Sequence, residues 1–436
     1  MTLFFRFCFL LTIMCLFPLQ ARSLHRESAD LLAPNLKSHL NSRTLVAATP
    51  FIADGNLKKN VDFWIRIYTQ YTTSQGLIHD SKYVDLVYEI LDFSTTSQSS
   101  SKIIRESKKR WKKLLLSVHE KQKNPEKMNE EEMRVFLLFK DINESNKFVN
   151  AARRKRMRFQ LGQKDRFIQG IIDSGKYLKL MEDIFRKKGL PSELTRLPFV
   201  ESSFNLQARS RVGASGVWQF MRSTGRLFLK INDSVDERND PIRATEAAAK
   251  LLTLNHKSLN SWPLAVTAYN HGRQGMMRAV QKVGTEDLEE LINSYRSRKF
   301  GFASSNFYAE LLAAIEVEKN AEKYFGKIAR AEPLKFYEVE LPEYIDLREI
   351  VSFLKLDVSQ LRELNPGLTE LTLSGRRLAP RGYFLRLPWD QKIPKEAAVR
   401  VFMAGYEQIP QIYKRRGQSY KKYGKGRPAR NNRKKR

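Results

Sequence analysis

The pattern of apolar and polar positions predicts a mainly helical chain, and in one segment it places an acid among apolar residues. Residues 189–221 read GLPSELTRLPFVESSFNLQARSRVGASGVWQFM. Pro191 suits the first turn of a helix, where its missing N–H costs nothing. On that helix Leu194, Leu197 and Glu201 fall at i, i+3 and i+7 and share one stripe. The pattern therefore predicts an acid on the face that the helix buries.

A carboxyl group in such surroundings is suited to acid chemistry. Burial disfavours its charged form, so its pKa rises and it can hold a proton near neutral pH. It can then donate that proton to a leaving group. Ser202 and Ser203 are placed to hydrogen-bond the acid, and Asn205 to end the helix. The ordinary alternative is that Glu201 faces water or caps a neighbouring helix.

Two further motifs follow in order along the chain. Residues 213–221 read GASGVWQFM, where the glycines allow close backbone approach beside Gln219. Residues 268–272 read AYNHG, after an alanine-rich helical run. Glu-Ser, then Gly-x-x-Gln, then Ala-Tyr-Asn resembles the catalytic domain of the lytic transglycosylases, the SLT family, over about residues 162–325. His271 and Val217-Trp218 depart from the residues common in that family, and neither departure touches the acid.

The resemblance implies a lysozyme-like fold and a specific reaction on peptidoglycan. Glu201 would protonate the oxygen of the β-1,4 bond between N-acetylmuramic acid (MurNAc) and N-acetylglucosamine (GlcNAc). The 6-hydroxyl of the muramic acid would then attack, and the same Glu would take its proton. The implied product is a 1,6-anhydro-MurNAc end. The reaction consumes no water and requires no metal or cofactor. The family pattern assigns binding of the sugar to Ser202, Gln219, Tyr269, Asn270 and Tyr308, whereas Trp218 and Phe220 are also explained by packing.

Two other functions stay open from the sequence. A hydrolytic muramidase needs a second, water-activating carboxylate. Asp233, Asp236 and Asp240, in the loop that precedes the next helix, are the candidates. A peptidoglycan-binding scaffold without catalysis is the other alternative, and the intact Glu201 argues against it.

The first residues predict export. Arg6 precedes a short apolar run that ends near Ala21, so residues 1–22 are expected to be a signal peptide that directs secretion across the inner membrane to the periplasm. An uncleaved anchor, or lipidation at Cys15, would instead leave the protein membrane-associated. Cys8 and Cys15 both lie in this segment, so the mature chain is expected to have no disulfide and no cysteine metal site. No histidine pair has i,i+4 spacing, which leaves a zinc site unsupported and favours structural roles for residues such as His79 and His271.

The chain divides into five expected parts around the catalytic domain. These are a signal peptide (1–22), an N-terminal mixed or helical region (43–150), the catalytic domain (151–328), a small α+β module (333–390) and a basic tail (410–436). Short apolar runs in residues 333–390 predict a strand, two helices and a strand. With the turn Leu-Asn-Pro-Gly at 364–367, this part resembles a LysM module, which implies glycan binding. A plain α+β packing module is the alternative.

A net charge of +30 is typical of a protein with a polyanionic partner or surface. A basic run at 151–158 and the acid-free tail carry much of it, and the run alone is equally explained as a solvated helix end. The export signal and the lack of a nucleic-acid motif argue against nucleic acid. The expected partners are peptidoglycan glycan strands, with an anionic wall polymer or a membrane surface as the partner of the tail. A tail that only solubilises the protein is the alternative.

Overall fold

A computed structural model describes residues 51–53, 55–390, 394 and 402. The predicted signal peptide and basic tail lie outside the described residues, as do both cysteines. Within the described residues, no helix combines the length and apolar character that a membrane crossing needs.

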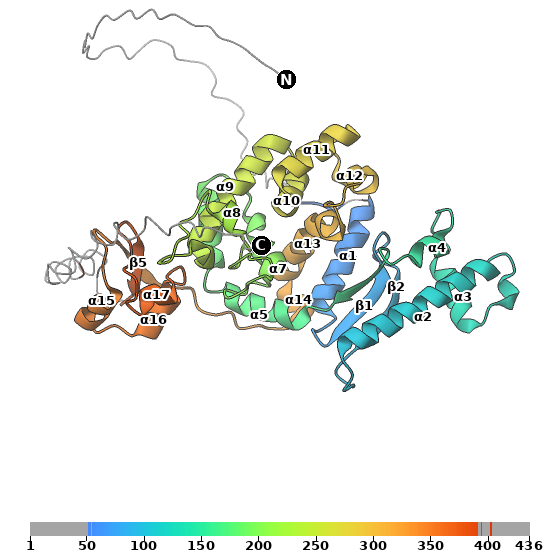
Figure 1. Cartoon of the computed structure of the whole chain (residues 1–436), viewed down its shortest axis with the longest axis horizontal. Helices are drawn as coiled ribbons and strands as arrows, with labels where there is room; N and C mark the ends of the chain where they lie inside the picture. The colour runs from blue at the N-terminus through green and yellow to red at the C-terminus, as the bar shows by residue number, and fades with distance from the viewer. Residues whose placement is uncertain (1–50, 54, 391–393, 395–401, 403–436) are drawn as a thin grey trace, which may run out of the picture. The chain divides into compact units, whose positions relative to one another are not determined.

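The N-terminal region combines helices with a three-stranded sheet (Figure 1). Its elements are α1 (Gly55–Thr69), β1 (Gln75–Asp80), β2 (Val87–Asp92), α2 (Ser100–Lys121), the 3-10 helix η1 (Pro125–Lys127), α3 (Glu130–Leu138), α4 (Lys147–Ala151) and β3 (Met157–Leu161). The strands lie in the order β2-β1-β3 and both pairings are antiparallel. The expected mixed character of the N-terminal region is confirmed.

The central strand β1 has a core on each of its faces. Successive side chains of a strand point to opposite sides, so Leu77 and Ile78, both fully buried, serve different cores. Leu77 belongs to the large core that also holds α1 and the helices that follow residue 162. Ile78 packs in an outer core with Trp111 of α2 and Phe148 of α4. The sheet therefore joins the outer helices to the large core.

The part of the chain from residue 162 to residue 325 is almost entirely helical. Its elements are α5 (Lys164–Ser174), α6 (Leu178–Lys187), η2 (Ser192–Arg196), α7 (Leu197–Ser202), α8 (Arg222–Gly225), η3 (Glu237–Asn239), α9 (Pro241–Leu259), α10 (Trp262–His271), α11 (Arg273–Val283), α12 (Leu288–Ser294), α13 (Phe302–Lys319) and α14 (Ala321–Phe325). The predicted fold class, mainly α with small sheets in the flanking regions, is confirmed.

Helix α1 packs along α13, although some 240 residues separate the two in sequence (Figure 1). The indole N–H of Trp64 donates to Oδ1 of Asn306 at 3.2 Å, and Nδ2 of Asn60 lies 3.3 Å from the same oxygen. The expected boundary between residues 150 and 151 stays a prediction. The large core contains residues from both sides of that boundary.

Residues 333–390 fold around a small core of their own. The elements are β4 (Phe336–Glu340), α15 (Leu347–Leu354), α16 (Val358–Leu364), α17 (Glu370–Leu373) and β5 (Phe384–Pro388), and β4 pairs with β5 in antiparallel fashion. The expected order of strand, two helices and strand is confirmed, with the short helix α17 in addition. We call this part the C-terminal module.

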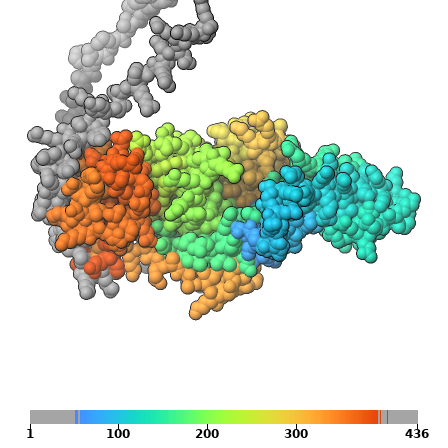
Figure 2. All heavy atoms as spheres, turned by 60° about the horizontal axis from the view of Figure 1, so that its bottom comes forward, coloured from blue at the N-terminus to red at the C-terminus, as the bar shows by residue number. Residues whose placement is uncertain are grey.

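The C-terminal module is joined to the loop before α9 by buried contacts. Val235 from that loop is fully buried in the core of the module, and Asp236 N–H donates to Gly367 O at 2.8 Å. Arg386 of β5 pairs with Asp240 at 2.8 Å, with 1% and 3% of the two side chains exposed. The space-filling view shows the two parts in contact (Figure 2).

Asp240 both caps α9 and pairs with Arg386, and one substitution distinguishes these two roles. Its Oδ1 caps α9 by accepting from the N–H groups of Ile242 and Arg243, while its charge balances buried Arg386. Asp240→Asn keeps a capping oxygen and removes the charge. Arg386 would then keep only its longer ion pair with Glu338, at 3.3 Å, so we expect unfolding to require about 2 kcal/mol less free energy, measured by urea denaturation.

Asp287→Asn is the matched control for this substitution. Asp287 caps α12 through Glu290 N–H at 2.7 Å, and its side chain is exposed. We expect a change of less than about 0.5 kcal/mol. Equal losses in the two variants would contradict a structural role for the Asp240–Arg386 pair.

Candidate active site

The segment that carries Glu201 is two short helices rather than the single helix expected. A 3-10 helix, η2, runs through Arg196, and α7 begins at Leu197. Pro198 is the physical reason, because it has no N–H to donate back to Leu194 O and continue an α-helix through this point. The helix also ends at Ser202, three residues before Asn205, where Ser203 takes a left-handed conformation (φ 51°). As the stripe predicted, Leu194 and Leu197 are fully buried.

Glu201 is half-buried, and burial raises the pKa of its carboxyl group to about 8. Desolvation is the cause, since a charged carboxylate loses more by leaving water than a neutral acid does. A glutamic acid with this pKa is mostly protonated at neutral pH. That is the state a proton donor needs.

Ser202 holds the acid's helix in place instead of bonding the acid. Its hydroxyl donates to Pro198 O at 3.1 Å and lies 3.0 Å from Val217 O. Ser203 likewise turns away, with its hydroxyl 3.5 Å from the side chain of Gln163. The expectation that these serines hydrogen-bond Glu201 is therefore wrong. Ser202 connects α7 to the loop at 213–221.

That loop needs its glycines, as the sequence indicated. Gly216 has φ +76°, and a Cβ there would lie 1.8 Å from Arg238 O, a contact no side chain tolerates. Gln219 also has a positive φ (47°), and its Nε2 donates to Gly216 O at 2.8 Å and to Ala208 O at 3.1 Å. Gln219 thus shapes the loop. Trp218 is fully buried, stacks on Phe185 and donates to Thr245, so its packing role is confirmed.

Tyr269 of α10 links the loop, the acid and α13. Its hydroxyl donates to Trp218 O at 2.8 Å, and its ring lies parallel to that of Phe307, 6.3 Å away. Burial and then the nearby charge of Glu201 raise the pKa of Tyr269 well above its usual range. Tyr269 therefore stays a neutral hydrogen-bond donor close to Glu201.

Asn270 and Tyr308 occupy different surroundings. Asn270 is exposed, and its Oδ1 accepts from the hydroxyl of Ser304 on α13 at 2.9 Å. Tyr308 is buried, with its ring centre 6.5 Å from that of Phe51. The sugar-binding roles expected for both residues stay predictions. The geometry brings Asn270 and Tyr269 together at the end of α10.

Sequence reasoning missed a second acid, Glu310 of α13. Ser304, Phe307 and Glu310 are spaced three apart, so they share the helix face that contacts Asn270 and Tyr269. Helix α13 also packs against α7. Burial, and then the charge of Glu201, raise the pKa of Glu310 to about 8. A lone acid in the run AELLAA is the same signal that identified Glu201, and it was available in the sequence.

The three aspartates considered as water-activating groups have structural partners. Asp233 lies 3.7 Å from Arg377, Asp236 pairs with Arg238 at 2.7 Å, and Asp240 pairs with Arg386. The carboxyl group whose charge interacts with that of Glu201 is Glu310 instead. Within the described residues, no group of three or more His, Cys, Asp or Glu side chains is placed to hold a metal ion.

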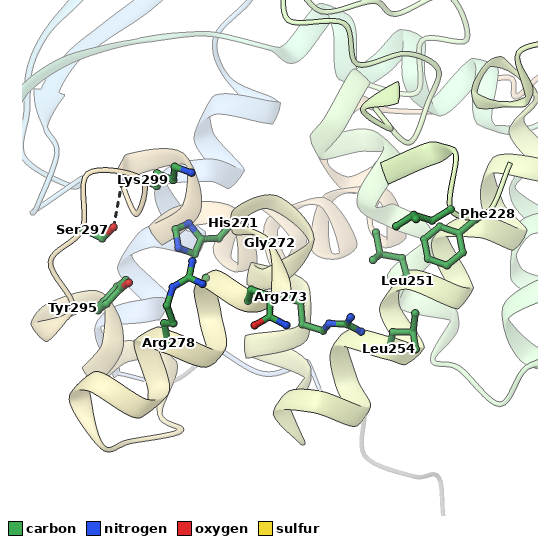
Figure 3. Close-up of a pocket in the computed structure, with 13 residues that line it drawn as sticks. Phe228, Leu251, Leu254, His271, Gly272, Arg273, Arg278, Tyr295, Ser297 and Lys299 are labelled. Atoms are coloured by element: carbon green, nitrogen blue, oxygen red, sulfur yellow. Dashed lines mark hydrogen bonds between the residues drawn. The ribbon is translucent and has the colours of Figure 1, made fainter. Parts of the chain in front are cut away.

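The structure also contains a cavity of about 420 Å³ (Figure 3). His271, the residue after Asn270, lines it, together with the first turn of α11. His271 packs edge-on against Phe300, with ring centres 5.1 Å apart. Burial, followed by the positive charge of Arg278, lowers the pKa of His271 from its usual value.

Comparison with known proteins identifies the domain. Residues 182–292 match the model of the transglycosylase SLT domain, a range that includes Glu201, Gln219 and Tyr269. The chain is 29% identical over 191 residues to membrane-bound lytic murein transglycosylase D of Escherichia coli K12. That match covers 43% of this chain and 42% of the relative, so the chain spans less than half the length of the curated relative it matches.

Two solved lytic transglycosylases are also similar to parts of the chain. The lytic transglycosylase Slt of Pseudomonas aeruginosa, solved as an inactive mutant, has a TM-score of 0.29 and 19% identity, and the match covers 35% of this chain and 25% of that one. The 70 kDa soluble lytic transglycosylase of Escherichia coli has a TM-score of 0.25 and 17% identity, and the match covers 54% of this chain and 32% of that one. Residues 182–292 thus match the transglycosylase SLT domain, and the chain is similar over part of its length to membrane-bound lytic murein transglycosylase D.

Proposed function

We propose that the chain is a peptidoglycan lytic transglycosylase that cleaves the β-1,4 bond between MurNAc and GlcNAc and leaves 1,6-anhydro-MurNAc ends. The observation that carries the proposal is Glu201, a half-buried acid with a pKa raised to about 8 inside the matched SLT region. Such a group is protonated before the reaction and ionises readily during it. One residue can thus serve first as acid and then as base.

The proposed reaction needs no external nucleophile. Glu201 donates its proton to the glycosidic oxygen as the C1–O bond breaks, and C1 passes through an oxocarbenium-like state. The 6-hydroxyl of the same MurNAc attacks C1, and the Glu201 carboxylate takes the hydroxyl proton. The GlcNAc end leaves with the first proton, so the acid is regenerated. Intramolecular attack gains from proximity, because nucleophile and electrophile belong to one ring.

The surrounding residues position the sugar in this proposal. Tyr269 is a neutral donor close to Glu201, and Asn270 presents its amide at an exposed edge of the site. Ser202 and Gln219 act indirectly, because their hydrogen bonds shape α7 and the adjoining loop. The C-terminal module is proposed to bind glycan strands in the manner of a LysM module, and the protein to act in the periplasm.

One observation favours the hydrolytic alternative. Glu310 supplies the second carboxyl group that a muramidase requires and that the sequence motifs did not offer. The proposed transglycosylase predicts that Glu310 does not activate water. Product analysis therefore decides between the two reactions.

The first test is product analysis with Glu201→Gln. We expect wild-type protein to release muropeptides with anhydro ends from purified peptidoglycan, and the variant to be slower by about 10²–10⁴-fold, because Gln cannot donate the proton. Mass spectrometry of the released products measures both. Glu193→Gln, on the same segment, is the control and should retain activity. Products with reducing ends from the wild type would show hydrolysis and contradict the transglycosylase proposal.

The second test is the pH dependence of the rate. Glu201 must carry a proton to act as acid, so activity should fall as the pH rises through about 8. The falling limb should thus lie well above the ordinary pKa range of glutamic acid. Initial rates on glycan strands, measured from below that range to above pH 8, check this. A rate that already falls between pH 4 and 5 would contradict the burial argument.

The third test is Glu310→Gln. An ionised Glu310 would favour the protonated form of Glu201, so its removal should move the falling limb of the pH profile to lower pH. We expect anhydro products to persist, with the rate reduced less than tenfold. If the wild type forms reducing ends and Glu310→Gln abolishes them, the muramidase alternative is correct.

A further inference from the structure

The cavity beside α11 carries positive charge on one wall. Arg273, Arg278 and Lys299 line it, and no Asp or Glu is among its lining residues. In the part of the chain that the structure describes, none of these three side chains pairs with a carboxylate. Arg278 and Lys299 are exposed, and Arg273 is half-buried. This wall therefore suits a ligand with a concentrated negative charge, such as a phosphate group.

The opposite wall is apolar and reaches the surface. The close-up shows Phe228, Leu251 and Leu254 across the cavity from His271 and Lys299 (Figure 3). Leu227 lines the cavity as well. Leu227 is 74% exposed and Leu254 is 39% exposed. Single exposed leucines are ordinary, but two that line one cavity form an apolar patch, and such a patch indicates an interaction site.

Further cations flank these two leucines. Arg226 directly precedes Leu227, and no acidic residue occurs from residue 202 to residue 232. On α9, Lys250 and Lys257 lie four residues before and three residues after Leu254, so the three share one face of the helix. Arg226, Lys250 and Lys257 are all exposed. Exposed apolar side chains with basic neighbours are typical of proteins that bind the surface of an anionic membrane.

The two walls together narrow the choice of ligand. A soluble polyanion could pair with the cations, but it has no apolar group to cover Leu227 and Leu254. A purely apolar ligand would leave the cations without a partner. A phospholipid has a phosphate at one end and acyl chains at the other, so it satisfies both walls.

We propose that the cavity binds the phosphate headgroup of an anionic phospholipid, while Leu227 and Leu254 insert among the acyl chains at the membrane surface. Arg273 and Arg278 pair with the phosphate through hydrogen bonds, and Lys299 adds a point charge. The cavity volume of about 420 Å³ is sufficient for a single headgroup. This contact would hold the protein on a bilayer whichever reaction it performs, so the inference is independent of the proposed function.

The first test measures binding of the full chain to vesicles by co-sedimentation. Vesicles that contain phosphatidylglycerol are compared with vesicles of phosphatidylcholine alone. The cavity variant carries Arg278→Gln with Lys299→Gln. The control variant carries Lys112→Gln with Lys113→Gln, which removes two exposed charges on α2. This control is needed because the net charge of +30 attracts the chain to any anionic surface.

We expect the cavity variant to bind the anionic vesicles about tenfold more weakly than the wild type, because each Lys or Arg at a membrane surface strengthens binding. The control variant should bind them nearly as well as the wild type. Equal losses in the two variants would show a general attraction of charge and overturn the proposal. Unchanged binding of the cavity variant would overturn it as well.

The second test locates the contact with the acyl chains. Leu227→Trp places an indole at the rim of the cavity, and lipids brominated on their acyl chains quench an indole that lies among them. We expect Leu227→Trp to show quenching beyond that of the wild type. Leu137→Trp is the control, because Leu137 is 54% exposed on α3 and does not line the cavity. No additional quenching with Leu227→Trp would contradict insertion at this surface.

A third measurement distinguishes a lipid from other sources of phosphate. Titration calorimetry with inorganic phosphate and with a soluble polyphosphate should show binding at least about tenfold weaker than that of the vesicles, because both probes leave Leu227 and Leu254 exposed to water. Polyphosphate that binds as tightly as the vesicles, and that the cavity variant binds more weakly, would identify a site for an anionic polymer. That result would overturn the assignment to lipid.

Discussion

The cost of keeping a carboxyl group half out of water governs the architecture around Glu201. Because folding raises the pKa of Glu201 to about 8, ionisation of this acid at high pH favours the unfolded state of the chain. The folded state must therefore hold the acid by other contacts. These contacts are the packing of the buried leucines of the same segment, the hydrogen bond from Ser202 to Val217 O and the hydrogen bond from Tyr269 to Trp218 O. Each of these contacts fixes the position of α7 without giving the carboxylate a counter-charge.

The same constraint explains why the second acid lies where it does. Glu310 lies on the face of α13 that contacts Tyr269, and burial and then the charge of Glu201 raise its pKa to about 8. Repulsion between two carboxylates favours the state in which one of them carries a proton. Arg273, Arg278 and Lys299 line the cavity beside α11.

Local patterns predicted the acid but not its neighbours. The spacing of Leu194, Leu197 and Glu201 was sufficient to place the acid on a buried face, because that depends only on helical geometry. The partner of the Ser202 hydroxyl was not predictable, since Val217 O is brought near by a turn that Gly216 makes possible. Glu310 could have been flagged, but its proximity to Glu201 is set by tertiary packing. The order of elements in residues 333–390 was predicted correctly because turns there separate short apolar runs. The ion pair that connects this part to Asp240 was not predicted.

The pairing of α1 with α13 also has a consequence for the order in which the chain is made. Trp64 and Asn60 leave the ribosome long before Asn306, the residue that they contact, has been synthesised. Until then the apolar side of α1 has no permanent partner, so the large core cannot close during most of translation. The large core can therefore close only after residue 306 has been synthesised, so this part of the protein completes its folding late in translation or after it.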